Sequence, residues 1–139
     1  MTRSPFSPAW MLLLLAAAAV SGCGGSRQLQ SVSLSPAVAN AQSFPNGQVA
    51  FTATGTFSKP PSPATLTSKD VLWCVGSSDG ICVGNANPGA TLDRNGMAQC
   101  NAGFTGTVIV LAGKASSTMG IPDSGQKLDV FGSAQLTCP

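Results

Sequence analysis

The stretch QVAFTATGTF, residues Gln48–Phe57, decides the fold class of this chain. Its small and apolar side chains recur at every second position, and threonines occupy part of the opposite face. One face therefore carries Val49, Phe51, Ala53, Gly55 and Phe57. An alternation with period two is typical of a β-strand that is buried on one side only, and β-branched threonines favour a strand.

The segments on either side of this strand can be interpreted in the same terms. Val32–Pro36 alternates and is stopped by a proline, which predicts an edge strand. Asn46-Gly47 marks the turn into the central strand. On the other side, Ser58–Pro63 (SKPPSP) contains three prolines, so we expect an exposed connection rather than a helix or a central strand.

The rest of the chain continues as short apolar runs between turn signals, and no long segment has helical periodicity. Ser77–Gly80 and Asn95-Gly96 are the clearest turn signals. Leu128–Cys138 is a strand pair or one bulged strand, with a kink near Gly132-Ser133. The other predicted strands are Val71–Val75, Ile81–Val83, Ala90–Leu92, Met97–Cys100 and Thr107–Ala112. Roughly seven short strands in this arrangement predict an all-β sandwich.

The amino terminus reads MTRSPFSPAWMLLLLAAAAVSGC. Arg3 precedes an apolar run, Ala9–Val20, that is shorter than the roughly 20 residues a membrane-spanning helix needs and fits a signal peptide. Val20-Ser21-Gly22-Cys23 resembles a bacterial lipobox. This resemblance implies that Cys23 is lipidated and becomes the new amino terminus, so that acyl chains anchor the protein to a membrane.

The lipobox also predicts the domain organisation. Residues 1–22 form the lipoprotein signal peptide, residues 23–30 a lipidated polar tether, and residues 31–139 one β-sandwich domain. Gly24 follows Cys23, where an aspartate would retain a lipoprotein of a diderm bacterium in the inner membrane. The resemblance therefore implies a cell-envelope protein anchored in the outer membrane, with the membrane as a partner through the lipid on Cys23.

Composition excludes several classes of function. The 139 residues include no histidine and no glutamate, so a Ser-His-Asp or Cys-His catalytic pair is impossible and no imidazole can bind a metal. Seven scattered basic residues do not form the patch that nucleic acid requires. Asp93-x-Asn95 is a fragment of a calcium loop that lacks the later ligands, and a hairpin turn is the better interpretation. We therefore expect no enzyme, no metal and no cofactor.

Four cysteines remain after Cys23: Cys74, Cys82, Cys100 and Cys138. Export favours two disulfides, for which three connectivities exist. Free or partly paired thiols are the second alternative, and zinc binding is the third because the spacings do not fit a zinc site. A catalytic thiol lacks an activating base.

Three stretches carry a resemblance to the group 2 bacterial immunoglobulin-like domain: GQVAFTATGTFS (Gly47–Ser58), LTSKDVLWCVGSSD (Leu66–Asp79) and NGMAQCNAGFTGTVIVLA (Asn95–Ala112). SVSLSP before them and ICVG between them occur in the family's order. The resemblance implies an immunoglobulin-like sandwich with Trp73 in the core between the sheets. The four cysteines, the SKPPSP segment and the long Lys114–Lys127 loop depart from the family.

The sandwich constrains the disulfides. If Trp73 points inward, alternation places Cys74 on the outer face, and Cys82 is outside as well. Cys82 and Cys100 would then lie on neighbouring short strands, which predicts a Cys82–Cys100 bridge and leaves Cys74 with Cys138.

Family members serve adhesion, carbohydrate or partner binding, or spacing at the cell surface. The resemblance therefore implies a lipid-anchored binding or adhesion module for a surface glycan or protein. The alternative is a structural envelope component or spacer without a dissociable ligand.

Overall fold

The computed structural model describes residues 25–83, 89–115 and 125–139. The predicted signal peptide and the lipidation site Cys23 lie outside the described residues, as does most of the Lys114–Lys127 loop. Within the described residues, no helix is long and apolar enough to cross a membrane.

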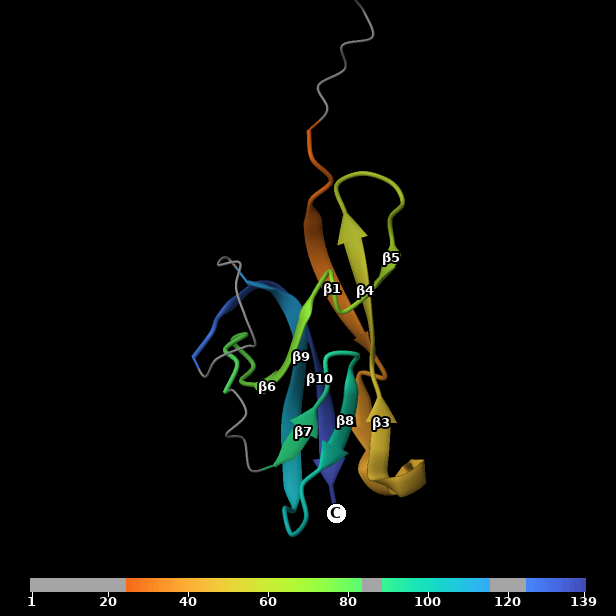
Figure 1. Ribbon diagram of the computed structural model, residues 1–139, viewed down its shortest axis with the longest axis vertical. Coiled ribbons are helices and arrows are strands. Elements are labelled where there is room, and N and C mark those ends of the chain that lie inside the picture. Colours follow the sequence, from red (N-terminus) through yellow and green to blue (C-terminus); the bar gives the residue numbers. More distant parts are fainter. Residues whose placement is uncertain (1–24, 84–88, 116–124) are drawn as a thin grey trace, which may run out of the picture.

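The regular secondary structure of the described residues is almost entirely β-strand, arranged as a sandwich (Figure 1). Two short 3₁₀ turns, η2 (Ala41–Ser43) and η3 (Pro45–Gly47), interrupt the strands. The strands are β1 Leu29–Ser35, β2 Val38–Asn40, β3 Gln48–Ala50, β4 Thr52–Phe57, β5 Ala64–Leu66, β6 Leu72–Gly76, β7 Ala90–Leu92, β8 Met97–Cys100, β9 Gly106–Ala115 and β10 Leu128–Cys138.

The strands form three hydrogen-bonded sheets, with orders β1-β4-β5, β3-β8-β7 and β2-β10-β9-β6. Strand β4 continues the line of β3, so the first two sheets together make one layer and the third makes the other (Figure 1). All pairings are antiparallel except that of β2 with β10. Apart from β5, which pairs with β4, and β2, which pairs with β10, one layer thus runs β1, β4/β3, β8, β7 and the other β10, β9, β6. This is the A-B-E-D and G-F-C order of an immunoglobulin-like sandwich.

The central stretch Gln48–Phe57 forms strand as predicted, but it is split at Phe51 between two sheets. Phe51 keeps the inward alternation, since Val49, Phe51 and Ala53 are all buried. Its backbone N–H donates to the carbonyl of Gly96 in the turn before β8. The bend therefore transfers the strand from one partner to another without moving its apolar face.

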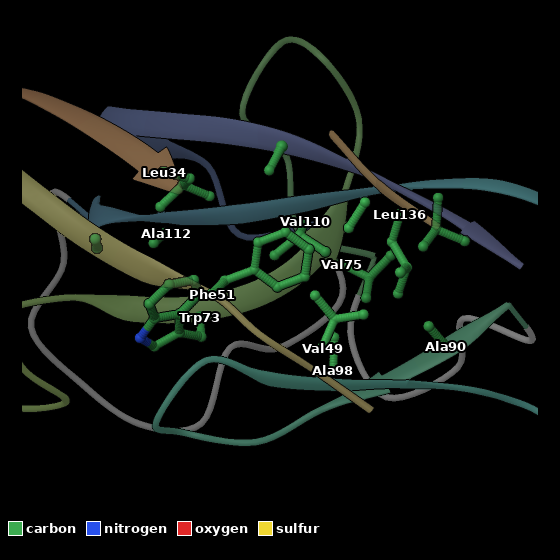
Figure 2. Close-up of a cluster of buried hydrophobic side chains, with 14 of the residues drawn as sticks. Leu34, Val49, Phe51, Trp73, Val75, Ala90, Ala98, Val110, Ala112 and Leu136 are labelled. Carbon is green, nitrogen blue, oxygen red and sulfur yellow. The ribbon is translucent and has the colours of Figure 1, made fainter. Parts of the chain in front are cut away.

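The main core fills the space between the layers, and Trp73 from β6 lies within it, 7% exposed (Figure 2). The predicted core position of Trp73 is confirmed. Its ring packs under Gly96, where an added Cβ would lie 2.8 Å from the ring. The positive φ of Gly96, 85°, and this close approach together explain the glycine in the Asn95-Gly96 turn.

The remaining strand predictions need four adjustments. Strand β1 begins at Leu29, two residues before the predicted domain boundary. The three-residue strands β2 and β5 were not predicted. Ile81–Val83 contributes only single bridges, to Gly76 and Lys127. Leu128–Cys138 is one strand, and its irregularity lies between Leu128 and Val130 rather than at Gly132-Ser133.

Candidate functional site

The four cysteines form two disulfides, but the predicted connectivity is wrong. The bonded pairs are Cys74–Cys82 and Cys100–Cys138, each with Cα atoms 5.7 Å apart. The bridges Cys82–Cys100 and Cys74–Cys138 do not occur.

A tight reversal of the chain explains the first pair. The Ser77–Gly80 turn sends Ile81–Val83 back along β6, where Ser77 N–H donates to Ile81 O at 3.0 Å and Gly76 bridges to Cys82. Cys74 and Cys82 then share the outer face of the β6 sheet, as alternation predicted. The expectation failed because it placed Ile81–Val83 beside β8, which belongs to the other layer.

The Cys74–Cys82 bridge is buried although it faces away from the main core. Cys74 is 5% exposed and Cys82 is fully covered. They pack with Leu111 and Leu128 in a second apolar cluster, the outer cluster. Segment 125–128 covers it, since Cys82 N–H donates to the carbonyl of Gln126 at 2.8 Å. This disulfide therefore fastens a small additional layer to the sandwich.

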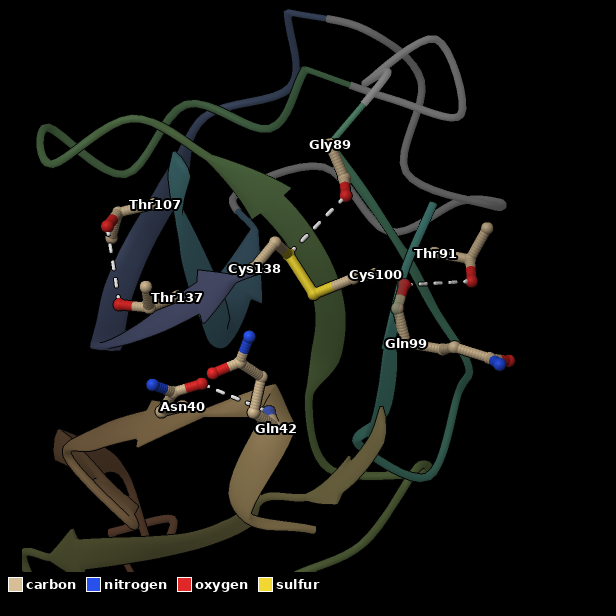
Figure 3. Close-up of a disulfide and its surroundings, with 9 residues drawn as sticks. All are labelled: Asn40, Gln42, Gly89, Thr91, Gln99, Cys100, Thr107, Thr137 and Cys138. Carbon is tan, nitrogen blue, oxygen red and sulfur yellow. Dashed lines mark hydrogen bonds between the residues drawn. A yellow bond between two sulfur atoms is a disulfide. The ribbon is translucent and has the colours of Figure 1, made fainter. Parts of the chain in front are cut away.

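The second bridge joins the two layers. Cys100 ends β8 in one layer and Cys138 ends β10 in the other. Figure 3 shows the bridge and its neighbours, and the Cys138 sulfur lies 3.7 Å from the carbonyl oxygen of Gly89. The cross-link fixes the spacing of the layers at the end of the sandwich where β10 finishes.

A groove of ≈ 320 Å³ lies beside this bridge, and we call it the end groove. The two 3₁₀ turns form one wall, and the turn from β8 to β9 forms the other. Its lining residues are Ala41, Gln42, Phe44, Asn46, Gly47, Gln99, Cys100, Asn101, Ala102, Gly103, Phe104 and Pro139.

The local sequence explains how these walls hold their shape. Asn46 and Gly47 both have positive φ, 57° and 66°, so the chain turns sharply out of η3 into β3. Gly103 has φ 79° in the opposite turn, which is closed by a hydrogen bond from Phe104 N–H to Asn101 O. Asn40 caps η2 by accepting a hydrogen bond from Gln42 N–H at 3.0 Å.

The end groove is lined by uncharged polar side chains and by apolar ones. None of its lining side chains is ionisable, while Gln42, Asn46, Gln99 and Asn101 bring amides and Phe44 and Phe104 bring half-buried rings. An amide both donates and accepts hydrogen bonds, and small-ligand sites combine apolar surface with a few such groups. None of these lining side chains is a general acid or base.

Three aspartates, Asp70, Asp79 and Asp93, accept hydrogen bonds within turns. Hydrogen bonds from the backbone N–H and the hydroxyl of Thr67 hold the pKa of Asp70 below its usual 3.8, and the Ser77 hydroxyl does the same for the pKa of Asp79. Asp93 accepts hydrogen bonds from the N–H groups of Asn95 and Met97, each at 2.8 Å. Asp93 is thus a turn residue. In the described part of the chain, no group of three or more Cys or Asp side chains is placed to hold a metal ion.

No family model matches this chain. A search of curated proteins also found no match.

Sequence reasoning missed the end groove entirely. Apart from Pro139, its residues come from two segments that are more than 50 positions apart, and only the Asn46-Gly47 turn signal marks one of them. The groove exists because the two layers end together at the Cys100–Cys138 bridge, and that bridge was assigned to other partners.

Proposed function

We propose that this protein is a lipid-anchored cell-envelope protein whose immunoglobulin-like sandwich is a non-enzymatic binding module, with the end groove as its binding surface. The lipobox at Val20–Cys23 supports the anchor, and Gly24 supports the outer membrane. The ligand class we propose is an uncharged polar one, a surface glycan or the polar backbone of a protein.

The observation that carries the proposal is the placement of the groove. The tether enters at one end of the sandwich, and the groove lies where β10 ends, at the opposite end (Figure 1). A protein held by lipid at its amino terminus would present the groove away from the bilayer. A disulfide behind one wall would keep that surface in a fixed shape, which lowers the ordering cost of binding.

The anchor is tested by metabolic labelling with palmitate. We expect label in the wild-type chain and none in Cys23→Ser. Label that persists in Cys23→Ser would refute the lipobox assignment.

Binding is tested by probing an array of glycans and matrix proteins with the detergent-extracted protein. We expect at least one specific hit at micromolar concentration. The absence of any hit would overturn the binding module and leave the structural envelope role.

A further inference from the structure

The residues that follow the predicted lipidation site are packed onto the sandwich. The guanidinium of Arg27 lies 3.4 Å above the centre of the Phe57 ring. The same group donates hydrogen bonds to the carbonyls of Lys59 and Pro61. Residues Gly25–Gln28 belong to the predicted polar tether, and the structure attaches them to the β4–β5 connection.

Further contacts make this attachment reciprocal. The ammonium of Lys59 donates to the carbonyl of Gly25. Gln28 N–H donates to the Ser58 hydroxyl at 3.0 Å, and Ser58 N–H donates back to Gln28 O at 2.9 Å. We call this surface, Gly25–Gln28 with Ser58–Pro63, the docking end.

Chain length then limits how far the docking end can be from the anchor. Cys23 precedes Gly25 by two residues, which span at most about 7 Å. If acyl chains on Cys23 are buried in a bilayer, Gly25 must lie at the headgroup layer. The packed tether cannot act as a spacer that would separate the sandwich from the membrane.

The docking end also carries the charge that such a surface would need. Arg27 and Lys59 of the docking end and the nearby Lys69 are exposed, and the acid beside them is Asp70, whose pKa is lowered first by hydrogen bonds from Thr67 and further by the charges of Arg27 and Lys69. The carboxylate of Asp70 accepts hydrogen bonds from Thr67 and keeps its negative charge, so the three cations outnumber a single acid and the surface is net positive. A cation near an anionic membrane surface gains about a fivefold increase in affinity.

We propose that the docking end is a second membrane contact, in which Arg27 and Lys59 bind the phosphates of anionic phospholipids in the bilayer that holds the anchor. This proposal rests on the lipidation of Cys23 in the proposed function. Lipid and cations together fix the sandwich upright on the membrane, and the end groove points outward.

Lysine labelling of the lipoprotein in vesicles tests this contact. The full-length chain is expressed in bacteria, extracted in detergent and reconstituted into phosphatidylcholine vesicles with or without phosphatidylglycerol. An amine-reactive reagent is applied, and mass spectrometry reports the labelling of Lys59 relative to Lys127. We expect phosphatidylglycerol to slow labelling of Lys59 at least about fivefold, and about 1 M salt, where the Debye length is about 3 Å, to reverse the effect.

A test variant and a control variant each remove one positive charge. Arg27→Gln removes a cation from the docking end, and Arg94→Gln removes one from the exposed turn before β8. We expect Arg27→Gln to lose most of the protection of Lys59 and Arg94→Gln to keep it. Equal labelling of Lys59 in the two kinds of vesicle, or equal loss in both variants, would overturn the proposal.

The anchor is read out separately. Sedimentation with pure phosphatidylcholine vesicles and the mass of the amino-terminal peptide report the lipid on Cys23 independently of Lys59. If neither shows lipid, the proposed anchoring fails. In that case the docking end is tested by sedimentation with phosphatidylglycerol vesicles, where we expect binding that salt weakens. If the protein does not sediment with these vesicles, the proposed contact is overturned as well.

Discussion

The Cys100–Cys138 bridge should contribute more to stability than the Cys74–Cys82 bridge. The perturbation is a pair of double variants, Cys100→Ala with Cys138→Ala and Cys74→Ala with Cys82→Ala. The first bridge joins positions 38 apart in sequence and the second joins positions 8 apart. Because a cross-link restricts the unfolded chain more when it closes a longer loop, the two variants should lose unequal amounts of stability.

The chain-entropy relation gives the magnitudes. It assigns about 4 kcal/mol to the Cys100–Cys138 loop and about 2.6 kcal/mol to the Cys74–Cys82 loop, a difference of about 1.3 kcal/mol. For a folded domain of about 115 residues, each kcal/mol corresponds to about 4 °C in Tm. We therefore expect Tm to fall by about 16 °C in the first variant and by about 10 °C in the second.

Thermal unfolding followed by circular dichroism measures both values, and a reductant supplies the control. In the reduced state no protein carries a cross-link, so differences that remain there come from lost packing, for instance around the fully covered Cys82. Subtracting them leaves the contribution of each bridge. A corrected loss that is equal for the two variants, or larger for Cys74–Cys82, would refute the reasoning.

Three other predictions follow from local geometry. Gly96→Ala should destabilise the fold by about 2–4 kcal/mol in urea unfolding, because the new Cβ at positive φ would meet the Trp73 ring at 2.8 Å; an unchanged midpoint would contradict this packing. Asp70→Asn should lower stability at neutral pH. Because the folded-state pKa of Asp70 is depressed by Thr67, the difference from wild type should persist down to about pH 4 and vanish as the pH falls through that lowered pKa; a difference that grows with acid would contradict it. Arg27→Ala should speed amide hydrogen exchange in the tether several-fold while global stability changes by about 1 kcal/mol, and equal exchange rates would show that the tether does not depend on this contact.

The sequence predicted the strands and their inward faces well, because apolar side chains alternate with polar ones along a strand that is buried on one face. The buried face of Gln48–Phe57 and the core position of Trp73 are local properties of the pattern. The split of that stretch at Phe51 could not be predicted from the alternation, because the inward-facing positions continue in the same order on both sides of the bend.

The cysteine pairing was predicted wrongly and the end groove was not predicted, for a different reason. Each depends on which segments meet in space, and alternation does not report that. The Cys74–Cys82 pair was nevertheless within reach of the sequence, because both side chains were placed on one outer face and a tight Ser77–Gly80 turn lies between them. Strand β2 pairs in parallel with β10 almost a hundred positions later, and three residues carry no pattern strong enough to show it.

A tryptic map without reduction gives an independent test of the connectivity. Cleavage after Lys69, Arg94, Lys114 and Lys127 puts Cys74 and Cys82 in one peptide, Cys100 in a second and Cys138 in a third. The structure predicts that the first peptide is closed on itself and that the other two are linked to each other. A species that links all three peptides would show the alternative pairing.

The binding role of the end groove is tested most directly by array binding of one blocked variant and its matched control. Ala102→Trp adds a bulky side chain at an exposed position of the groove lining, and Met97→Trp adds the same side chain at an exposed position on β8 outside that lining. We predict that Ala102→Trp loses the wild-type hits at least tenfold in affinity while Met97→Trp retains them. Hits that survive in Ala102→Trp, or that disappear equally in both variants, would contradict the assignment of the end groove as the binding surface.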